Sequence, residues 1–474
     1  MKYRRGVVAG ILALVMAQGL AGCAGAPAVP RAQVNLPPTW RLAETRKPLG
    51  PAPDLRTWWR MFHDPGLDQL VDTVLAQNLD LRAAQERLAA ARAFASADAG
   101  RFRPGFGIQG GSTPTPGATQ SYYQVNFDAQ WELGLFGRAT SSGRVAAGRT
   151  EIARADIAAA RVAVVAECVR DYVVLRAAQR QSQLERQLIV LQRQKQALLE
   201  VRVREKLQDL TVLSEARAAL KRRIADAAKA RAAADIAEQK IALLIGRAGP
   251  PRWLQQSTSV PQPANHALQV IPADLLRTRP DVQRAEAQVL EAAGKAGIAK
   301  SNLYPHLSLG AGLSWSVTQV SDQLSTSSAV PFFGPVIDIP LFDWGERAAT
   351  LRGRNHLLQA ALIAYRRTVY AAVADTEIAL ARLHAARVRS EWSRGEVQSL
   401  GAAAKAAELR DRLGLGDGLG RTAAESARAE AELEASQADA QEGVAWVALY
   451  KALGGAALPE KAQTAPPETH GQPH

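Results

Sequence analysis

The side chain with the most distinctive chemistry in this sequence is the thiol of Cys23. It follows an apolar run at residues 7–22 that comes after three basic residues and ends in Leu20-Ala21-Gly22. A basic start, an apolar run of this length and small residues before a cleavage point are typical of a secretory signal peptide. The pattern therefore indicates an exported chain with a cysteine at its new N-terminus.

Leu20-Ala21-Gly22-Cys23 resembles the lipobox of bacterial lipoproteins. The resemblance implies cleavage before Cys23, diacylation of its thiol and acylation of its new amino group. Ala24 stands where an aspartate would favour retention in the inner membrane, so the resemblance implies delivery to the outer membrane. Alternatively, Cys23 is an ordinary residue of a membrane-spanning helix, but the apolar run is shorter than the roughly 20 residues that a span needs.

The other motifs that could do chemistry favour a structural interpretation. Cys168 lies in a helical run without a second thiol to pair with, so we interpret it as a core residue. The seven histidines form no HExxH pair and no Cys/His cluster, and residues 310–312 and 414–420 lack parts of a nucleotide-binding loop. Residues 279–281 (RPD) resemble an ordinary helix start. We therefore expect no metal, no cofactor and no enzymatic activity.

The composition favours long helices over compact mixed domains. Aromatic residues make up 5% of the 474 residues, while alanine, leucine, arginine, glutamate and glutamine crowd several long segments. The net charge is +13, and it falls to +10 without Lys2, Arg4 and Arg5. A basic excess can mark a nucleic-acid-binding protein. Here the secretory signal argues against nucleic acid, and we interpret the charges as solvated helix faces.

The chain contains a tandem duplication. Asp80 and Asp281 each head a predicted helix and lie 201 residues apart, whereas Gly246 and Gly454 each close a helix and lie 208 apart. Between these positions both halves carry a helix, a pair of strands and two very long helices. The second β-hairpin is five residues longer than the first.

Two segments alternate strictly between apolar and polar residues, the period of a strand between two environments. A soluble sheet also alternates, but segments of about ten residues with polar turns match the strands of outer-membrane barrels. The partner strands are weaker, since residues 104–112 are rich in glycine and residues 330–341 contain three prolines. The apolar positions are Tyr123, Val125, Phe127, Ala129 and Trp131 in the first segment and Leu307, Leu309, Ala311, Leu313, Trp315 and Val317 in the second.

Four strands cannot close a membrane barrel, because the smallest barrels use about eight and an open edge in lipid leaves backbone groups unpaired. Two copies would fill the interior, whereas three would give twelve strands and a lumen. The proline-free helices at 139–204 and 345–412 favour the larger assembly, because about 60 residues reach roughly 90 Å. A leucine seam for coiled-coil packing is formed by Leu184, Leu188, Leu191 and Leu198.

Several further motifs carry a family resemblance. Residues 58–67 (WWRMFHDPGL), 131–138 (WELGLFGR), 275–286 (LLRTRPDVQRAE) and Tyr304-Pro305 resemble signatures of the TolC-like outer-membrane factor family, in its NodT-type lipoprotein branch. The resemblance covers about residues 20–457. It implies a mixed fold, in which a homotrimer forms a twelve-stranded membrane β-barrel above a long α-helical coiled-coil barrel.

One residue departs from the family pattern. Where the family usually has aspartate in the run W-E-L-D-L-F-G-R, this chain has Gly134. A local contact between barrel and helices is therefore in doubt.

The duplication and the composition divide the chain into five predicted segments. The two β-hairpins are expected at residues 103–132 and 305–342. The segments are 1–22 (signal peptide), 23–57 (lipid anchor and extended proline-rich linker), 58–250 (first repeat), 251–457 (second repeat) and 458–474 (disordered tail).

The resemblance implies a passive outer-membrane exit duct of a tripartite efflux system for small molecules such as drugs or toxic compounds. Its implied partners are a periplasmic adaptor protein, an inner-membrane pump and outer-membrane lipid. One alternative is the exit duct of a type I protein secretion system. Another is a structural envelope lipoprotein without a lumen.

The turns of the long helical hairpins are the candidate periplasmic gate. The segment 410–419 (RDRLGLGDGL) resembles the turn of the family, in which an arginine precedes a glycine by four residues, as Arg410 precedes Gly414. Three copies of Asp417 would form an acidic ring that repels itself unless Arg410, Arg412 or an ion offsets it. In the first half only Asp209 could play this part. Alternatively, Asp417 only caps the helix that follows it.

Overall fold

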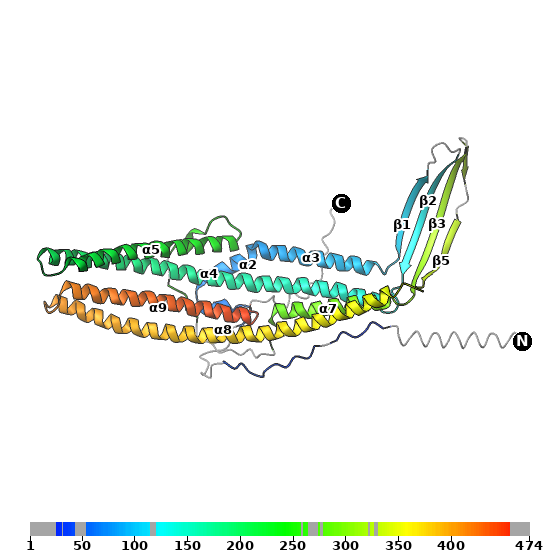
Figure 1. Cartoon of the computed structure of the whole chain (residues 1–474). Coiled ribbons are helices and arrows are strands. Elements are labelled where there is room, and N and C mark those ends of the chain that lie inside the picture. The colour runs from blue at the N-terminus through cyan, green and yellow to red at the C-terminus, as the bar shows by residue number, and fades with distance from the viewer. Residues whose placement is uncertain are drawn as a thin grey trace. The chain divides into compact units, whose positions relative to one another are not determined.

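A computed structural model gives the fold of most of the chain (Figure 1). The predicted signal peptide, Cys23 and the predicted tail at 458–474 lie outside the described residues. Among the described helices, none combines the length and apolar character that crossing a membrane requires. The described residues are 25–30, 32–42, 54–113, 120–256, 259–263, 274, 278–320, 323–326 and 330–455.

The chain forms two compact units, and each draws on both halves of the sequence. The first unit comprises Met1–Val34, Glu86–Ala155 and Gln283–Thr368 and contains the β-sheet. The second comprises Asn35–Gln85, Asp156–Val282 and Val369–His474. The long helices α4 and α8 each contribute their first part to the first unit and their remainder to the second.

The helices confirm the tandem duplication. Each helix of the first half has a counterpart of the same length in the second half: 22 residues for α3 and α7, 67 for α4 and α8, and 35 for α5 and α9. The bounds are Leu79–Gly100 for α3, Pro280–Ser301 for α7, Arg138–Arg204 for α4, Glu346–Arg412 for α8, Leu210–Leu244 for α5 and Gly418–Ala452 for α9.

The spacing between the halves changes from 201 to 208 residues across the sheet. Five of the seven extra residues lie in the second hairpin, as the sequence predicts. The other two lie just after it, because Phe136-Gly137 and Trp344-Gly345 are equivalent. All four residues have left-handed backbone angles, with φ of 51° and 74° in the first pair and 53° and 82° in the second.

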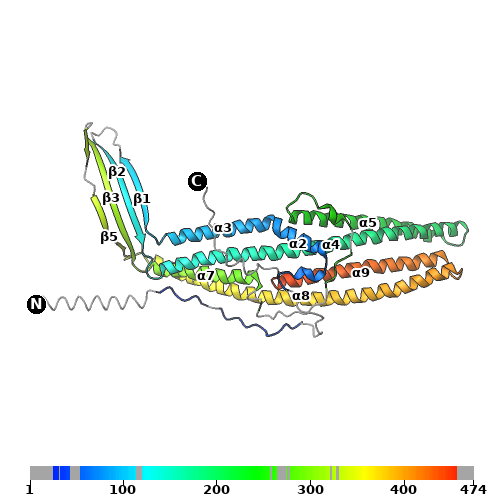
Figure 2. The ribbon, with the colours of Figure 1, turned by 180° about the vertical axis from the view of Figure 1, so that it is seen from behind.

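The strands form one antiparallel sheet (Figures 1 and 2). β1 (Gly105–Thr113) pairs with β2 (Gln120–Glu132), which pairs with β3 (His306–Val320) and so joins the two halves. The far side of β3 holds β4 (Gln323–Thr326) and then β5 (Val330–Asp338). The predicted fourth strand is therefore in two pieces, and it ends at Asp338 rather than at residue 342. Proline cannot donate a ladder hydrogen bond, which suits the prolines of this stretch to an edge strand.

The register places the predicted apolar residues on one face. Phe127 lies opposite Leu313, and Trp131 lies opposite Leu309. The alternate positions pair Asn126 with a polar residue of β3 and Asp128 with a glycine. A slip of one residue would exchange the two faces, so the alternation read from the sequence also specifies this pairing.

β5 departs from the simple alternation. Phe332 lies opposite Gly312, on the face that carries the polar residues of β2 and β3. A Cβ at Gly310 would lie 3.1 Å from the Phe332 ring and 3.5 Å from Val336. The glycines of β3 therefore make room for apolar side chains that sequence alternation does not predict.

The second unit has an aromatic core built around the 58–67 motif. The η1 turn (Trp58–Phe62) buries both tryptophans, and Trp58 stacks on Tyr450 of α9 at 5.1 Å between ring centroids. Asp64 then caps α2 (Pro65–Gln77) by accepting the Gly66 and Leu67 N–H groups at 2.8 and 3.1 Å. This helix start explains the Asp-Pro-Gly of the motif.

The leucine seam of α4 is partly as predicted. Leu184, Leu188 and Leu191 are buried, but Leu198 is 36% exposed. Leu199 takes its place in a cluster with Leu213 and Ala216 of α5. The heptad spacing fails there because α4 must pack against its returning partner at the turn. Cys168 is fully buried, as predicted, and burial raises the pKa of its thiol.

Glycine closes α9 in a conformation that other residues resist. Gly454 has φ of 76°, and an added Cβ would lie 2.4 Å from the Thr278 carbonyl oxygen. Gly401 lies inside α8 with nothing within 4 Å of an added Cβ.

Opposite effects are expected for alanine at these two glycines. Gly454→Ala should destabilise the protein by at least about 1–2 kcal/mol, because left-handed backbone penalises a Cβ. Gly401→Ala should stabilise it by about 0.5–1 kcal/mol through helix propensity. Thermal unfolding of the purified protein should show a lower Tm for the first variant and an equal or higher Tm for the second. A lower Tm for both would contradict the assigned conformations.

Candidate functional site

One face of the sheet is apolar and exposed. Phe106, Ile108, Phe333 and Ile337 are 86%, 69%, 81% and 58% exposed, and the β2 and β3 residues beside them are also partly or fully exposed. Contiguous apolar surface of this kind marks a contact with lipid or protein. The sheet therefore presents a surface suited to hydrocarbon rather than to water.

The other face holds hydrogen-bonded polar groups. The Gln124 amide donates to Asn126 Oδ1 at 2.7 Å and to Ser314 Oγ at 2.9 Å, which links β2 to β3. Small residues occupy many of the positions around them. This face is suited to water, and the sheet as a whole separates two solvents.

The sheet is open at both edges within one chain. β1 has a strand partner on one side only, and so do β4 and β5 among the described residues. Backbone groups at such edges need partners if the apolar face meets lipid. The sheet is thus a segment of a larger closed structure.

The first helical hairpin ends in a capped turn. Lys206 adopts a left-handed conformation with φ of 58°, and the Leu207 N–H returns to the Arg202 carbonyl at 2.8 Å. Asp209 then caps α5, accepting the Thr211 N–H at 2.9 Å.

The second hairpin repeats this turn 208 residues later. Gly414 has φ of 69°, and the Leu415 N–H returns to the Arg410 carbonyl at 2.8 Å. Asp417 caps α9 by accepting the Gly420 N–H at 2.8 Å. Both candidate gate aspartates are therefore helix caps, and Arg410 and Gly414 contribute through the backbone of the turn.

An ion pair joins the two tips. The Arg202 guanidinium donates to Asp417 Oδ2 at 2.6 Å, across 215 positions of sequence. We call this contact the tip ion pair. The sequence predicted that Arg410 or Arg412 would offset Asp417, but Arg412 pairs with Glu408 at 2.6 Å instead. Arg202 is the residue that sequence reasoning missed, although the 208-residue repeat makes it the equivalent of Arg410.

The tip ion pair is charged at neutral pH. The Gly420 N–H and then the Arg202 guanidinium lower the pKa of Asp417 below its usual value. A lowered carboxyl pKa means that the interaction is present at neutral pH and is lost only as the pH falls through that pKa. Asp209 also has a lowered pKa, but through the N–H and hydroxyl of Thr211 and without an arginine.

Gly134 takes a conformation that explains the departure from the family pattern. Its φ is 58°, and an added Cβ would lie 2.7 Å from both Ala139 and the Phe102 ring. Glycine therefore allows Phe102 and Ala139 to pack closely where the chain leaves the sheet. Among the described residues, no three His, Cys, Asp or Glu side chains are grouped as a metal site would require.

Comparison with known proteins places the chain in one family. Residues 70–247 and 271–455, one stretch in each half, match the family described as Outer membrane efflux protein. Cation efflux system protein CusC of Escherichia coli O6:H1 is 24% identical over 380 residues, covering 78% of this chain and 82% of CusC. Outer membrane protein OprJ of Pseudomonas aeruginosa is 26% identical over 468 residues, covering 94% of this chain and 95% of OprJ.

A solved structure shares the fold. The outer-membrane channel OprN has a TM-score of 0.77 and 28% identity, covering 90% of this chain and 99% of that one. The strand pairs, the long helical hairpins and the duplication described above agree with this likeness. The chain belongs to the outer membrane efflux protein family and is an outer-membrane efflux channel.

Proposed function

We propose that the protein is the passive exit duct of a tripartite efflux system and works as a homotrimer. The observation that carries the proposal is the sheet, which is apolar on one face, polar on the other and open at both edges. Three copies supply twelve strands, so that each β1 edge can pair with the β4 and β5 edge of a neighbour. A barrel of this size leaves a water-filled lumen.

The partners follow from the passive character of the duct. Export against a gradient needs an energy source, which we assign to an inner-membrane pump reached through a periplasmic adaptor protein. The cargo we propose is small molecules such as drugs or toxic compounds. Cys23 carries the lipid anchor, and residues 1–22 are its signal peptide. A structural lipoprotein without a lumen would conduct no ions in a planar bilayer, whereas the proposed duct conducts.

We propose that the hairpin tips form the periplasmic gate and that the tip ion pair holds it closed. Arg202 and Asp417 belong to different hairpins, so their contact restrains the tips relative to each other. Both side chains are largely solvent-exposed, at 39% and 51%. An exposed pair is worth little stability, which allows a partner protein to break it.

Two matched variants separate gating from capping. Asp417→Asn retains a good N-cap but removes the charge that pairs with Arg202, so single-channel conductance should rise while the Tm changes little. Asp209→Asn makes the same change at the equivalent cap, which has no arginine partner, and should leave conductance unaltered. Equal conductance in Asp417→Asn and the unmodified protein would remove Asp417 and Arg202 from the gate.

A pair of arginine substitutions tests which face of the sheet meets lipid. Phe127→Arg should destabilise the membrane-inserted trimer by about 2–4 kcal/mol if the residue lies near the bilayer midplane. Asn126→Arg, one position away on the polar face, should be better tolerated. Trimer yield and resistance to denaturant measure the difference. Equal tolerance would show that the strands do not span lipid.

The lipid anchor has a direct chemical test. Cys23→Ser should abolish incorporation of radiolabelled palmitate, because serine lacks the thiol that is acylated. Some barrel insertion should survive, since the apolar sheet face does not depend on the anchor. Label in the Cys23→Ser protein would disprove the assignment.

A further inference from the structure

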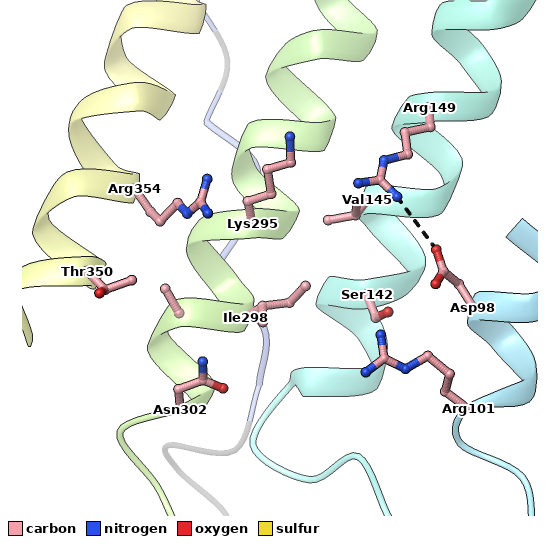
Figure 3. A pocket seen from close by; sticks show the side chains of 11 residues that line it. Asp98, Arg101, Ser142, Val145, Arg149, Lys295, Ile298, Asn302, Thr350 and Arg354 are labelled. Atoms are coloured by element: carbon pink, nitrogen blue, oxygen red, sulfur yellow. Dashed lines mark ion pairs between the residues drawn. The ribbon is translucent and has the colours of Figure 1, made fainter. Parts of the chain in front are cut away.

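The first unit contains a pocket with a strongly basic lining. It has a volume of about 330 Å³ and is lined by α3, α4, α7 and α8, all near the ends that adjoin the sheet. Four cations reach it, one from each helix: Arg101, Arg149, Lys295 and Arg354 (Figure 3). The one acidic residue of the lining is Asp98.

The acidic residues nearby neutralise only part of this charge. Arg149 lies 3.9 Å from Asp98 and 3.2 Å from Glu291, and Lys295 lies 2.8 Å from Glu291. Partial burial acts to raise the pKa of Glu291, but Lys295 and Arg149 outweigh it and hold the pKa below its usual value, so Glu291 is ionised. Arg101 and Arg354 have no ion-pair partner among the described residues. The four cations and two carboxylates leave a net charge of +2.

The N-terminal segment shows which side of the helices the pocket faces. The Arg144 guanidinium donates to the Pro27 carbonyl, and an added Cβ at Gly297 would lie 3.7 Å from Pro27. At 3.6 residues per turn, both residues point about 130° away from the pocket-lining stripes of their helices. The segment and the pocket therefore lie on different sides of the helix layer.

The position of the lipid anchor makes the pocket side the inner one. Cys23 lies four residues before Pro27, and its acyl chains can enter the membrane only outside the barrel. The segment at Pro27 thus marks the outer side of the helices. The four helices also lie next to one another in Figure 3, and one pocket touching all of them is expected on the concave side of such a layer.

We propose that this pocket is an anion-binding site in the lumen, present three times in the trimer, which selects cargo bearing phosphate, sulfate or carboxylate groups. The proposal rests on the trimeric duct and the lipid anchor proposed above. The unpaired Arg101 and Arg354 supply the charge that draws the anion in, and Asn302 and Ser142 add uncharged hydrogen-bonding groups. Fixed charge in a narrow aqueous passage concentrates counter-ions and favours their passage.

Ion selectivity in planar bilayers of neutral phosphatidylcholine tests the site. The reversal potential in a KCl gradient gives the chloride-to-potassium permeability ratio, and inorganic pyrophosphate serves as a multivalent probe. Neutralisation in Arg101→Gln/Arg354→Gln should lower the permeability ratio and weaken block by pyrophosphate, each by about fivefold, the effect expected of a unit charge about 4 Å away in water. An unchanged ratio and unchanged block in a conducting channel would overturn the proposal.

A matched control keeps the test specific. Lys300 and Arg352 lie on α7 and α8, about half a turn from the pocket-lining residues of the same helices, and Lys300→Gln/Arg352→Gln removes the same charge. This variant should keep the selectivity of the unmodified protein, and an equal loss in both variants would show a general field instead of a site. Absence of any conductance in the unmodified protein would refute the duct itself, which is a separate result.

A lipid headgroup offers the same phosphate chemistry from outside the duct. Adding phosphatidylglycerol to the bilayer should leave pyrophosphate block unchanged if the pocket faces the lumen. Loss of the block in phosphatidylglycerol, together with a rise in the Tm that Arg101→Gln/Arg354→Gln abolishes, would assign the pocket to lipid and overturn the proposal.

Discussion

The need to pair every backbone N–H and C=O group in lipid constrains the whole architecture. A single chain offers a sheet with one apolar face and two open edges, and hydrocarbon leaves such edges without water as a partner. Closure by other copies removes the edges. The glycines of β1 and the prolines of β5 lie on the strands that must meet across that closure, and neither strand is stabilised from both sides within one chain.

The duplication meets this constraint with two similar but unequal halves. Helices repeat at 208 residues with identical lengths, and each hairpin turn closes with the same backbone hydrogen bonds. The halves differ in the side chains that these turns carry. Glycine takes the left-handed position in one turn and Lys206 takes it in the other, where a Cβ imposes strain. Only one of the two capping aspartates has an arginine from the opposite hairpin.

Charge serves different purposes in the two units. At the hairpin tips, one arginine is matched to one carboxylate in an exposed contact that is weak enough to break. In the basic pocket, cations exceed carboxylates and two of them have no ionic partner among the described residues. The same basic composition thus supports a switchable contact in one place and an unsatisfied field in the other.

The sequence by itself determined the duplication, the helix lengths and the two faces of β2 and β3. These features follow from periodicity and from helix signals such as Asp417 and Gly454, which act over a few residues. Tertiary structure alone decided which distant residues meet. Arg202 pairs with Asp417 across 215 positions, Phe332 fills space left by Gly310, and four cations from four helices line one pocket. Local pattern carries no record of such contacts, because they depend on how helices and strands from both halves pack together.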